Sequence, residues 1–266
     1  MMLKGKNAII YGAGGSLGSA VAKALASSGA KVFLTGRTLD SLKKIADEII
    51  ESGGKAEVAR VDALNEAEVN SHLQMVIAKA GSVDVSFSAI DFQVVQNVGL
   101  IEISVDDFVR PITIAMTCFF VTAIAAGKAM MKQGSGVILS LTATPGGIGY
   151  PYTGGFAPAC AAMESFSRNL ASELGIHGVR VVNIRSAGSP DSRLFKQAIE
   201  DRPEEMAPII RGMENDTMLK SLPLMADIAN VAVFLSSDIA GKITGVTVDV
   251  TSGTTGGFNY RVPRKE

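Results

Sequence analysis

The segment near the N-terminus that predicts the fold is Asn7-Ala8-Ile9-Ile10-Tyr11-Gly12-Ala13-Gly14-Gly15-Ser16-Leu17-Gly18. Its first five residues are typical of a short buried strand, which leads into a glycine-rich turn and then a helical pattern over 16–28. A turn between a strand and a helix directs backbone N–H groups and the positive helix end toward one place, where a pyrophosphate binds. The segment therefore predicts a nucleotide site. A tight turn that only packs the helix is the alternative.

The same alternation of strands and helices continues along the chain. We expect strands at 7–11, 31–35, 56–61, 83–89, 136–141, 179–184 and 245–250. We expect helices at 16–28, 38–52, 66–80, 105–131, 155–174 and 225–236, and Pro111 makes 105–131 either one long helix or two consecutive ones. This order predicts an α/β fold with a doubly wound parallel sheet, the Rossmann fold, in which seven strands carry helices on both faces.

No linker, repeat or low-complexity segment divides the sequence, which predicts a single domain over 1–266. The segment 189–222 is polar, mostly helical in pattern and interrupted by prolines, and it is the only candidate for a subdomain. Insertions beside the carboxyl ends of such a sheet often close over a substrate. We therefore expect 189–222 to choose a small-molecule substrate, although no motif in it identifies that molecule.

Composition argues against several classes of function. The 266 residues are 47% apolar and carry a formal net charge of −1 with both signs interspersed, so no nucleic-acid partner is expected. The most apolar segment, 112–126, is shorter than the roughly 20 residues that span a bilayer, and no signal peptide is evident. We expect a cytoplasmic protein with no membrane partner, and a solvated basic tail at 261–265.

The side chains that could bind metals or form disulfides are few. Cys118 and Cys160, the only cysteines, lie in predicted helices, which indicates a reducing compartment rather than a disulfide framework. No group of residues has the spacing of a metal site.

The end of the second strand predicts which dinucleotide binds. An acidic side chain there would accept hydrogen bonds from the adenosine ribose, but this chain has Gly36-Arg37-Thr38. Gly36 leaves space and Arg37 has the charge to pair with a 2′-phosphate. We therefore predict NADP(H) as the cofactor, and the alternative is an ordinary surface arginine.

Several motifs spread along the chain resemble those of short-chain dehydrogenases/reductases. Gly12, Gly15 and Gly18 fit the Gly-x-x-Gly-x-x-Gly form of the phosphate loop, with Tyr11 in the place of the usual Thr. The stretches 228–237 and 243–245 are similar to the C-terminal signature, and 155–174 is similar to the family's catalytic helix. The resemblance covers the whole chain and implies cofactor contacts from Ser16, Leu17, Thr38, Asp62, Ala63, Ala89, Gly188 and Ser192. Asp62 also suits a simple helix cap.

The chain departs from the family at the residues that carry the chemistry. Phe156 stands where the family has Tyr, Cys160 where it has Lys, Ala143 where it has Ser, and Ile114 at or beside the place of a water-binding Asn. A phenylalanine has no exchangeable proton, and a thiol with a pKa of about 8.5 carries no positive charge at pH 7. Since a positioned proton donor accelerates a reaction roughly 10²–10⁴-fold, ordinary ketone reduction by the family mechanism is not expected.

Other side chains in the active-site loops could replace the missing acid, and the candidates are Thr142, Thr144, Tyr150, Tyr152 and Asp91. Tyr152, one turn before Phe156, is the best proton donor available, and Thr142 lies next to the position of the family's serine. Tyr152 also suits an aromatic side chain that packs on a pocket wall. Cys160 has no histidine nearby in the sequence, so we interpret it as a buried packing residue rather than a nucleophile.

Three hypotheses of function remain open at this point. The first is an NADP(H)-dependent oxidoreductase with a non-standard active site, which reduces an imine or an activated C=C bond. The second is a catalytically inactive structural or regulatory subunit, and the third is a non-redox enzyme that uses the same pocket. The glycine loop and Arg37 favour the first. The apolar segments 112–131 and 245–250, together with the resemblance, also predict a homodimer or homotetramer.

Overall fold

A parallel sheet forms the centre of the molecule in the computed structural model, which describes residues 1–256. Its strands are β1 (Asn7–Tyr11), β2 (Lys31–Gly36), β3 (Lys55–Arg60), β4 (Val85–Ser88), β5 (Gly136–Ala143), β6 (Val179–Ser186) and β7 (Thr247–Val250). All pairings are parallel and the order is β3-β2-β1-β4-β5-β6-β7. This confirms the doubly wound fold of seven strands. The basic stretch 261–265 lies outside the described residues.

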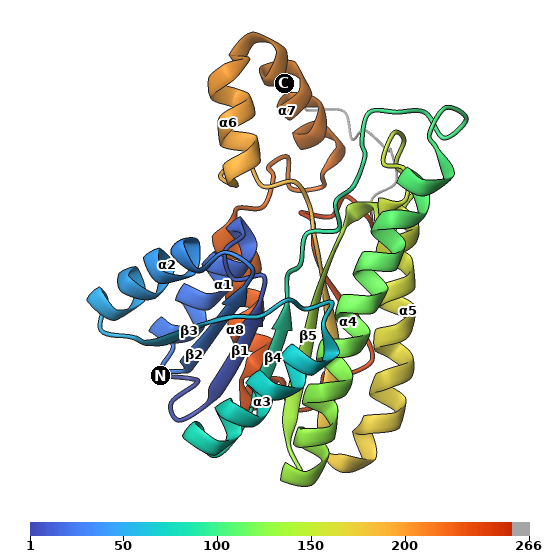
Figure 1. Ribbon diagram of the computed structural model, residues 1–266. Helices are drawn as coiled ribbons and strands as arrows, with labels where there is room; N and C mark the ends of the chain where they lie inside the picture. Colours follow the sequence, from blue (N-terminus) through green and yellow to red (C-terminus); the bar gives the residue numbers. More distant parts are fainter. Residues whose placement is uncertain (257–266) are drawn as a thin grey trace.

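Helices cover both faces of the sheet (Figure 1). One face carries α1 (Ser16–Ser27), α2 (Leu39–Glu51) and α8 (Met225–Ser236); the other carries α3 (Glu66–Ala80), α4 (Val105–Gln133) and α5 (Phe156–Leu174). The strand order reverses between β1 and β4, whose neighbours lead away in opposite directions. Ligands of such sheets bind in the crevice outside the carboxyl ends of the strands at this reversal.

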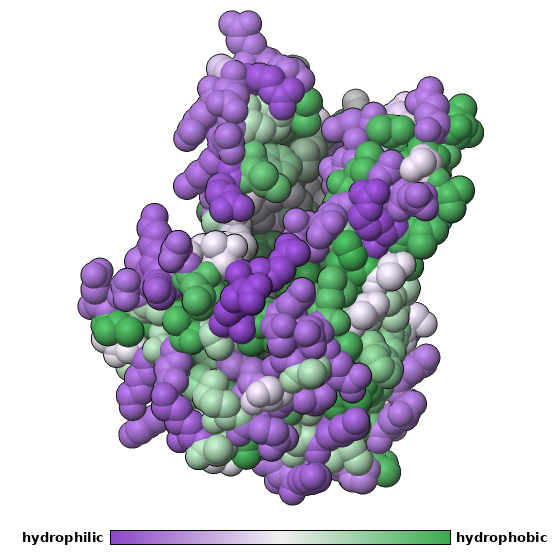
Figure 2. Space-filling model, in the orientation of Figure 1, coloured by the Kyte–Doolittle hydropathy of each residue, from purple (hydrophilic) through white to green (hydrophobic). Residues whose placement is uncertain are grey.

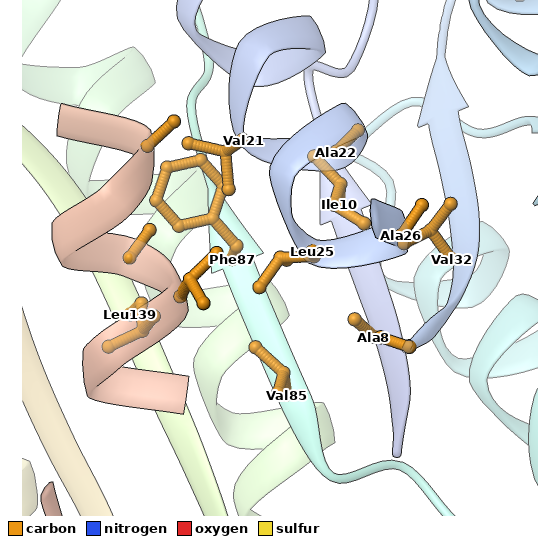
Figure 3. Packing of buried hydrophobic residues seen from close by; sticks show 14 of the residues in the cluster. Ala8, Ile10, Val21, Ala22, Leu25, Ala26, Val32, Val85, Phe87 and Leu139 are labelled. Atoms are coloured by element: carbon orange, nitrogen blue, oxygen red, sulfur yellow. The ribbon is translucent and has the colours of Figure 1, made fainter. Parts of the chain in front are cut away.

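The core beneath α1 and α8 is built from alternate residues of buried strands. Ala8 and Ile10 on β1, and Val85 and Phe87 on β4, lie on the face of the sheet that α1 covers, in one cluster with Leu25 of α1 (Figure 3). These side chains are fully buried. Because strand residues two apart point to one face, the same strands present Ile9 and Tyr11 to the core on the opposite face.

The structure decides between the two alternatives expected around Pro111. The segment is one continuous helix, α4, with Pro111 buried inside it, and Gly155 approaches this turn closely. A Cβ on Gly155 would lie 1.9 Å from the Phe108 carbonyl oxygen and 2.8 Å from Pro111 Cγ. By length and composition alone α4 is long and apolar enough to cross a membrane. Its buried residues pack against α3, α5 and the sheet, as expected of the buried helix predicted over 112–126.

The segment 189–222 contains two helices that stand beyond the carboxyl ends of the strands (Figure 1). These are α6 (Arg193–Asp201) and α7 (Pro203–Asp216), and the chain turns between them at Arg202, whose backbone leaves the helical region at φ −142° and ψ 62°. The two helices rise over the crevice between β1 and β4, so they lie where a bound ligand would be covered.

Candidate active site

The glycine loop after β1 is held in place by close backbone contacts. Gly12 has a φ of +77°, and a Cβ there would lie 2.4 Å from the Ala89 carbonyl oxygen. A Cβ on Gly18 would lie 2.3 Å from the Gly12 carbonyl oxygen. Since atoms cannot approach so closely, both positions require glycine, and the loop brings the start of α1 against β4. Gly15 caps α1 without any side-chain hydrogen bond, so the first N–H groups of the helix are left for a ligand.

A groove of about 400 Å³ opens beside this loop. Seven of the predicted cofactor residues line it: Gly12, Gly15, Arg37, Thr38, Asp62, Ala63 and Ala89. They come from the loops that follow β1, β2, β3 and β4, which supply the phosphate, adenosine-ribose and adenine ends of a dinucleotide site. The glycine backbone, the uncapped helix start and the arginine at the far end together fit a phosphorylated dinucleotide.

The remaining predicted cofactor residues lie around the groove rather than in its lining. Gly18 is buried against Gly12, and Leu17 packs partly buried against the core. Ser16 contacts the start of α6, Ser192 precedes that helix, and Gly188 lines a second cavity described below. Asp62 does not cap α3. Its carboxylate accepts a hydrogen bond from the Leu64 N–H, while Asn65 caps the helix.

One charged residue of the groove was missed by sequence reasoning. Arg193, the first residue of α6, lines the groove, and its backbone N–H donates to Ser16 Oγ at 3.1 Å. The hydrogen bond ties α6 to the start of α1, and the groove is lined by two cations, Arg37 and Arg193. Ser16 and Arg193 are 177 positions apart in sequence, and only the fold brings Arg193 to this place.

A second cavity of about 240 Å³ lies next to the groove, between the β5–α5 loop and the α6–α7 helices. Figure 2 shows the surface hollowed here, with hydrophobic side chains of α6 and α7 facing the hollow. Ala143 and Phe156, at the family positions of the serine and the tyrosine, both line the cavity. The other lining residues are Gln96, Thr144, Pro145, Tyr150, Thr153, Ala187, Gly188, Phe195, Met213, Asp216, Leu222 and Thr254. The sequence resemblance aligns this cavity, through Ala143 and Phe156, with the place of the family's chemistry.

The structure does not bring Tyr152 into this cavity. Its backbone has a φ of +60° and its side chain is 61% exposed, while Tyr150, two residues earlier, lines the cavity instead. Thr142 is also held elsewhere: it is buried, donates from Oγ1 to Glu164 Oε1 at 2.9 Å and accepts from Asn183 Nδ2 at 2.7 Å. Of the five candidate donors, Tyr150 and Thr144 line the cavity, Asp91 lines the groove, and Tyr152 and Thr142 line neither within residues 1–256.

A buried ion pair lies behind the cavity wall. Arg185 donates from Nε and Nη2 to the two oxygens of Glu164 at 3.0 and 2.6 Å, and from Nη1 to Asp249 at 3.1 Å. Hydrogen bonding to Glu164 raises the pKa of Arg185 above its usual range. A Cβ on Gly147 would lie 2.4 Å from Arg185 Nη1, so the turn after β5 packs directly on the guanidinium. The pair therefore fixes the loop that carries the cavity wall.

Cys160 is fully buried one turn before Glu164, and burial raises the pKa of its thiol to about 12. A Cβ on Gly146 would lie 2.8 Å from the Cys160 Cβ, so the side chain fills space beneath the β5–α5 loop. The thiol is therefore neutral at physiological pH and supplies neither the charge of a lysine nor a nucleophilic thiolate.

The comparisons with known proteins show the family to which the chain belongs. The model of the enoyl-(acyl carrier protein) reductase family matches residues 12–255. The 7α-hydroxysteroid dehydrogenase of Escherichia coli (strain K12) is 30% identical over 258 residues, covering 95% of each chain. The chain is a short-chain dehydrogenase/reductase.

Two further relatives show the range within this family. The NADH-dependent enoyl-[acyl-carrier-protein] reductase 1 of Rhizobium meliloti (strain 1021) is 30% identical over 256 residues, covering 95% of this chain and 91% of that one. A protein of Beutenbergia cavernae solved with bound NADP superimposes with a TM-score of 0.83 at 27% identity, covering 96% and 98% of the two chains. Relatives of this short-chain dehydrogenase/reductase thus include proteins that are named or solved with either nicotinamide cofactor.

Proposed function

We propose that this short-chain dehydrogenase/reductase is an NADP(H)-dependent oxidoreductase that works without a proton donor on its α5 helix. The observation that carries the proposal is the contrast within one crevice. Its dinucleotide groove keeps the glycine loop, the uncapped helix start and two arginines, while Phe156 and Ala143 line the reaction cavity. When bound, the nicotinamide supplies the hydride.

The choice of NADP(H) over NAD(H) rests on the end of β2. Gly36, Arg37, Thr38 and Ser41 line the groove there, so a guanidinium and two hydroxyl groups surround the position of the adenosine ribose. No acidic residue follows β2 directly to repel a 2′-phosphate. Arg193 adds positive charge where the pyrophosphate would lie beside the start of α1.

The substrate proposed is an imine or an activated C=C bond. Hydride addition to either does not depend on proton donation from α5, because the proton is already present on an iminium nitrogen or can come later from water. The chain's own residues exclude water and orient the substrate: Phe156, Phe195 and Met213 surround the cavity with apolar surface. We also propose that residues 189–222 cover the substrate as a small subdomain.

The cellular location and the oligomeric state of the enzyme are also part of the proposal. We propose a cytoplasmic homodimer or homotetramer in which α4 and α5 face another copy. Phe120 on α4 is 52% exposed and lies against Phe166 of α5, with ring centroids 5.8 Å apart. Size-exclusion chromatography with light scattering gives the mass that checks this.

The test of the cofactor proposal is a fluorescence titration of the full chain with NADPH and NADH. Arg37→Ala should raise the Kd for NADPH by about tenfold to a hundredfold, because a hydrogen-bonded charge pair is lost, and leave the Kd for NADH unchanged. Arg60→Ala, at the exposed end of β3 and outside the groove lining, is the matched control and should change neither. No NADPH binding at millimolar concentration would overturn the proposal.

A second measurement separates an enzyme from an inactive relative. The chain, once loaded with NADPH, is offered a panel of imines, enones and ketones while NADPH absorbance is followed. Oxidation with imines or enones supports the oxidoreductase. Tight NADPH binding with no turnover on any compound would instead favour a structural or regulatory subunit. The observation that favours this second candidate is the presence of Phe156 and Cys160 where the resemblance aligns the family's Tyr and Lys.

A further inference from the structure

The charge of the reaction cavity is set by a single side chain. Among the cavity-lining residues of 1–256, Asp216 is the only one with a formal charge, and no lysine, arginine or histidine lines the cavity. Within the described residues Asp216 forms no ion pair and no side-chain hydrogen bond. The basic group that contacts this turn, Lys220, donates to the backbone oxygen of Asn215 instead.

The position of Asp216 adds to its negative potential. It is the last residue of α7, a helix of 14 residues with no basic residue in its last turn. The carboxyl end of a helix carries a partial negative charge, so the helix and the carboxylate act in the same direction. Asp216 is exposed, and it lines a cavity whose other lining residues within 1–256 are uncharged.

Three aromatic rings from separate elements also line the cavity. Tyr150 comes from the loop before α5, Phe156 from the first turn of α5, and Phe195 from α6. The faces of aromatic rings attract cations, and several rings together with a carboxylate form the usual cage for organic cations. The rings are held in place: Phe156 packs on Phe92 with centroids 6.0 Å apart, and a Cβ on Gly188 would lie 2.9 Å from Phe195 Cζ.

We infer that the cavity selects a small organic cation, and that the substrate class is therefore a positively charged imine, an iminium ion. This deepens the proposed function and rests on it. The volume of about 240 Å³ is below the roughly 300 Å³ at which pockets for drug-sized ligands begin, so the cation carries one or two rings rather than a long chain.

The chemistry of an iminium ion fits a site that has no acid on α5. When its carbon accepts a hydride, a C–H bond of the reduced nicotinamide would break, a C–H bond would form on the substrate, and the π electron pair of the C=N bond would move onto nitrogen. The nicotinamide would be oxidised and take up the positive charge, while the product is a neutral amine, so no proton is consumed. Phe156 in place of a tyrosine then removes nothing that this step needs, and its ring contributes to binding of the cation.

The first test compares two probes of one shape by isothermal titration of the NADPH-loaded full chain. Cyclohexylammonium, the form of cyclohexylamine at pH 7, should bind about threefold to tenfold more tightly than cyclohexanol, because it pairs with the Asp216 carboxylate and the rings. The preference is modest because an ion pair with the exposed Asp216 is partly screened by water. Asp216→Asn should remove this preference. Glu214→Gln changes another carboxylate of α7 that does not line the cavity and should keep it.

The outcomes separate this inference from the proposed function. Equal binding of the two probes, binding of neither at millimolar concentration, or an unchanged preference in Asp216→Asn would overturn the cation cavity even if NADPH binds. Failure to bind NADPH, with the cation preference present in the free chain, would overturn the oxidoreductase proposal alone. In the turnover arm, N-methyl-3,4-dihydroisoquinolinium should be reduced faster than cyclohexenone, and the reverse order would overturn the inference.

Discussion

The two halves of the crevice have diverged to different extents. The groove beside β1 and β2 keeps a loop in which even a methyl group on Gly12 or Gly18 would collide with backbone oxygen atoms. The cavity beside β5 and α5 is lined by Phe156 and Ala143 and has Cys160 buried beneath its loop, three residues that the sequence resemblance aligns with polar catalytic positions of the family. The difference teaches that backbone geometry and side-chain chemistry change independently. The backbone of the groove is fixed by contacts that only glycine permits, whereas a side chain that lines the cavity can be replaced by another of similar volume.

The strongest way to break this contrast is to restore the missing chemistry. Phe156→Tyr combined with Cys160→Lys should create reduction of small ketones, at least about 100-fold above the unmodified chain, since a positioned acid contributes roughly 10²–10⁴-fold. Initial rates with NADPH and cyclohexanone measure the gain. Phe156→Tyr alone is the control and should gain little, because the lysine is needed to lower the pKa of the phenol.

The double variant is informative only if its groove is intact, so its Kd for NADPH is measured alongside. Unchanged NADPH binding without ketone reduction would contradict the idea that only the acid is missing. It would mean that the cavity itself has changed its selectivity, as the carboxylate of Asp216 indicates.

The next effect concerns what holds the reaction cavity together. Arg185→Met leaves Glu164 buried without its partner, and we expect the free energy of unfolding to fall by about 3–5 kcal/mol, the usual result of breaking a buried ion pair. Urea denaturation followed by circular dichroism measures this. Glu164→Gln in the Arg185→Met background should recover part of the loss.

A matched ion pair on the cofactor side gives the comparison its control. Lys23 and Glu48 join α1 to α2, and both side chains are more than a third exposed. Lys23→Met should therefore change the free energy of unfolding by no more than about 1 kcal/mol. If Arg185→Met and Lys23→Met lower the free energy of unfolding by similar amounts, the Arg185 pair does not support the cavity.

Much of the fold and of the cofactor groove could be predicted from the sequence because both depend on local patterns. The seven strands, the glycine loop and Arg37 follow from residues that are neighbours along the chain. Strand ends were less accurate: β5 and β6 each run two residues beyond the expected 141 and 184, because neighbouring strands extend the hydrogen bonding.

The missed residues of the site depend on tertiary contacts. Arg193, Phe195 and Asp216 lie in 189–222, which has no motif, and they reach the crevice only because α6 and α7 fold back over it. Tyr152 and Tyr150 differ for a local reason that the sequence does not reveal, the φ of +60° at Tyr152. The Arg185–Glu164 pair joins residues 21 apart on different elements, and no periodicity predicts it.

The smallest expected effect concerns the two cysteine thiols and tests whether either half of the crevice holds a reactive one. Cys118 lines the groove and Cys160 lies beneath the cavity, and burial raises the pKa of each thiol to about 12. An unfolded thiol has a pKa of about 8.5, so the neutral thiols favour the folded state below that pH, and this contribution is lost as the pH rises from about 8.5 toward 12.

At pH 8.5 iodoacetamide should label the native chain at least about 100-fold more slowly than the urea-unfolded chain, because it reacts with the thiolate. Cys160→Ser should cost about 1 kcal/mol of stability and leave the Kd for NADPH unchanged. Rapid labelling of Cys160 in the native chain, absent in Cys160→Ser and accompanied by loss of NADPH oxidation, would instead make this thiol a catalytic nucleophile and the reaction cavity chemically active on its own.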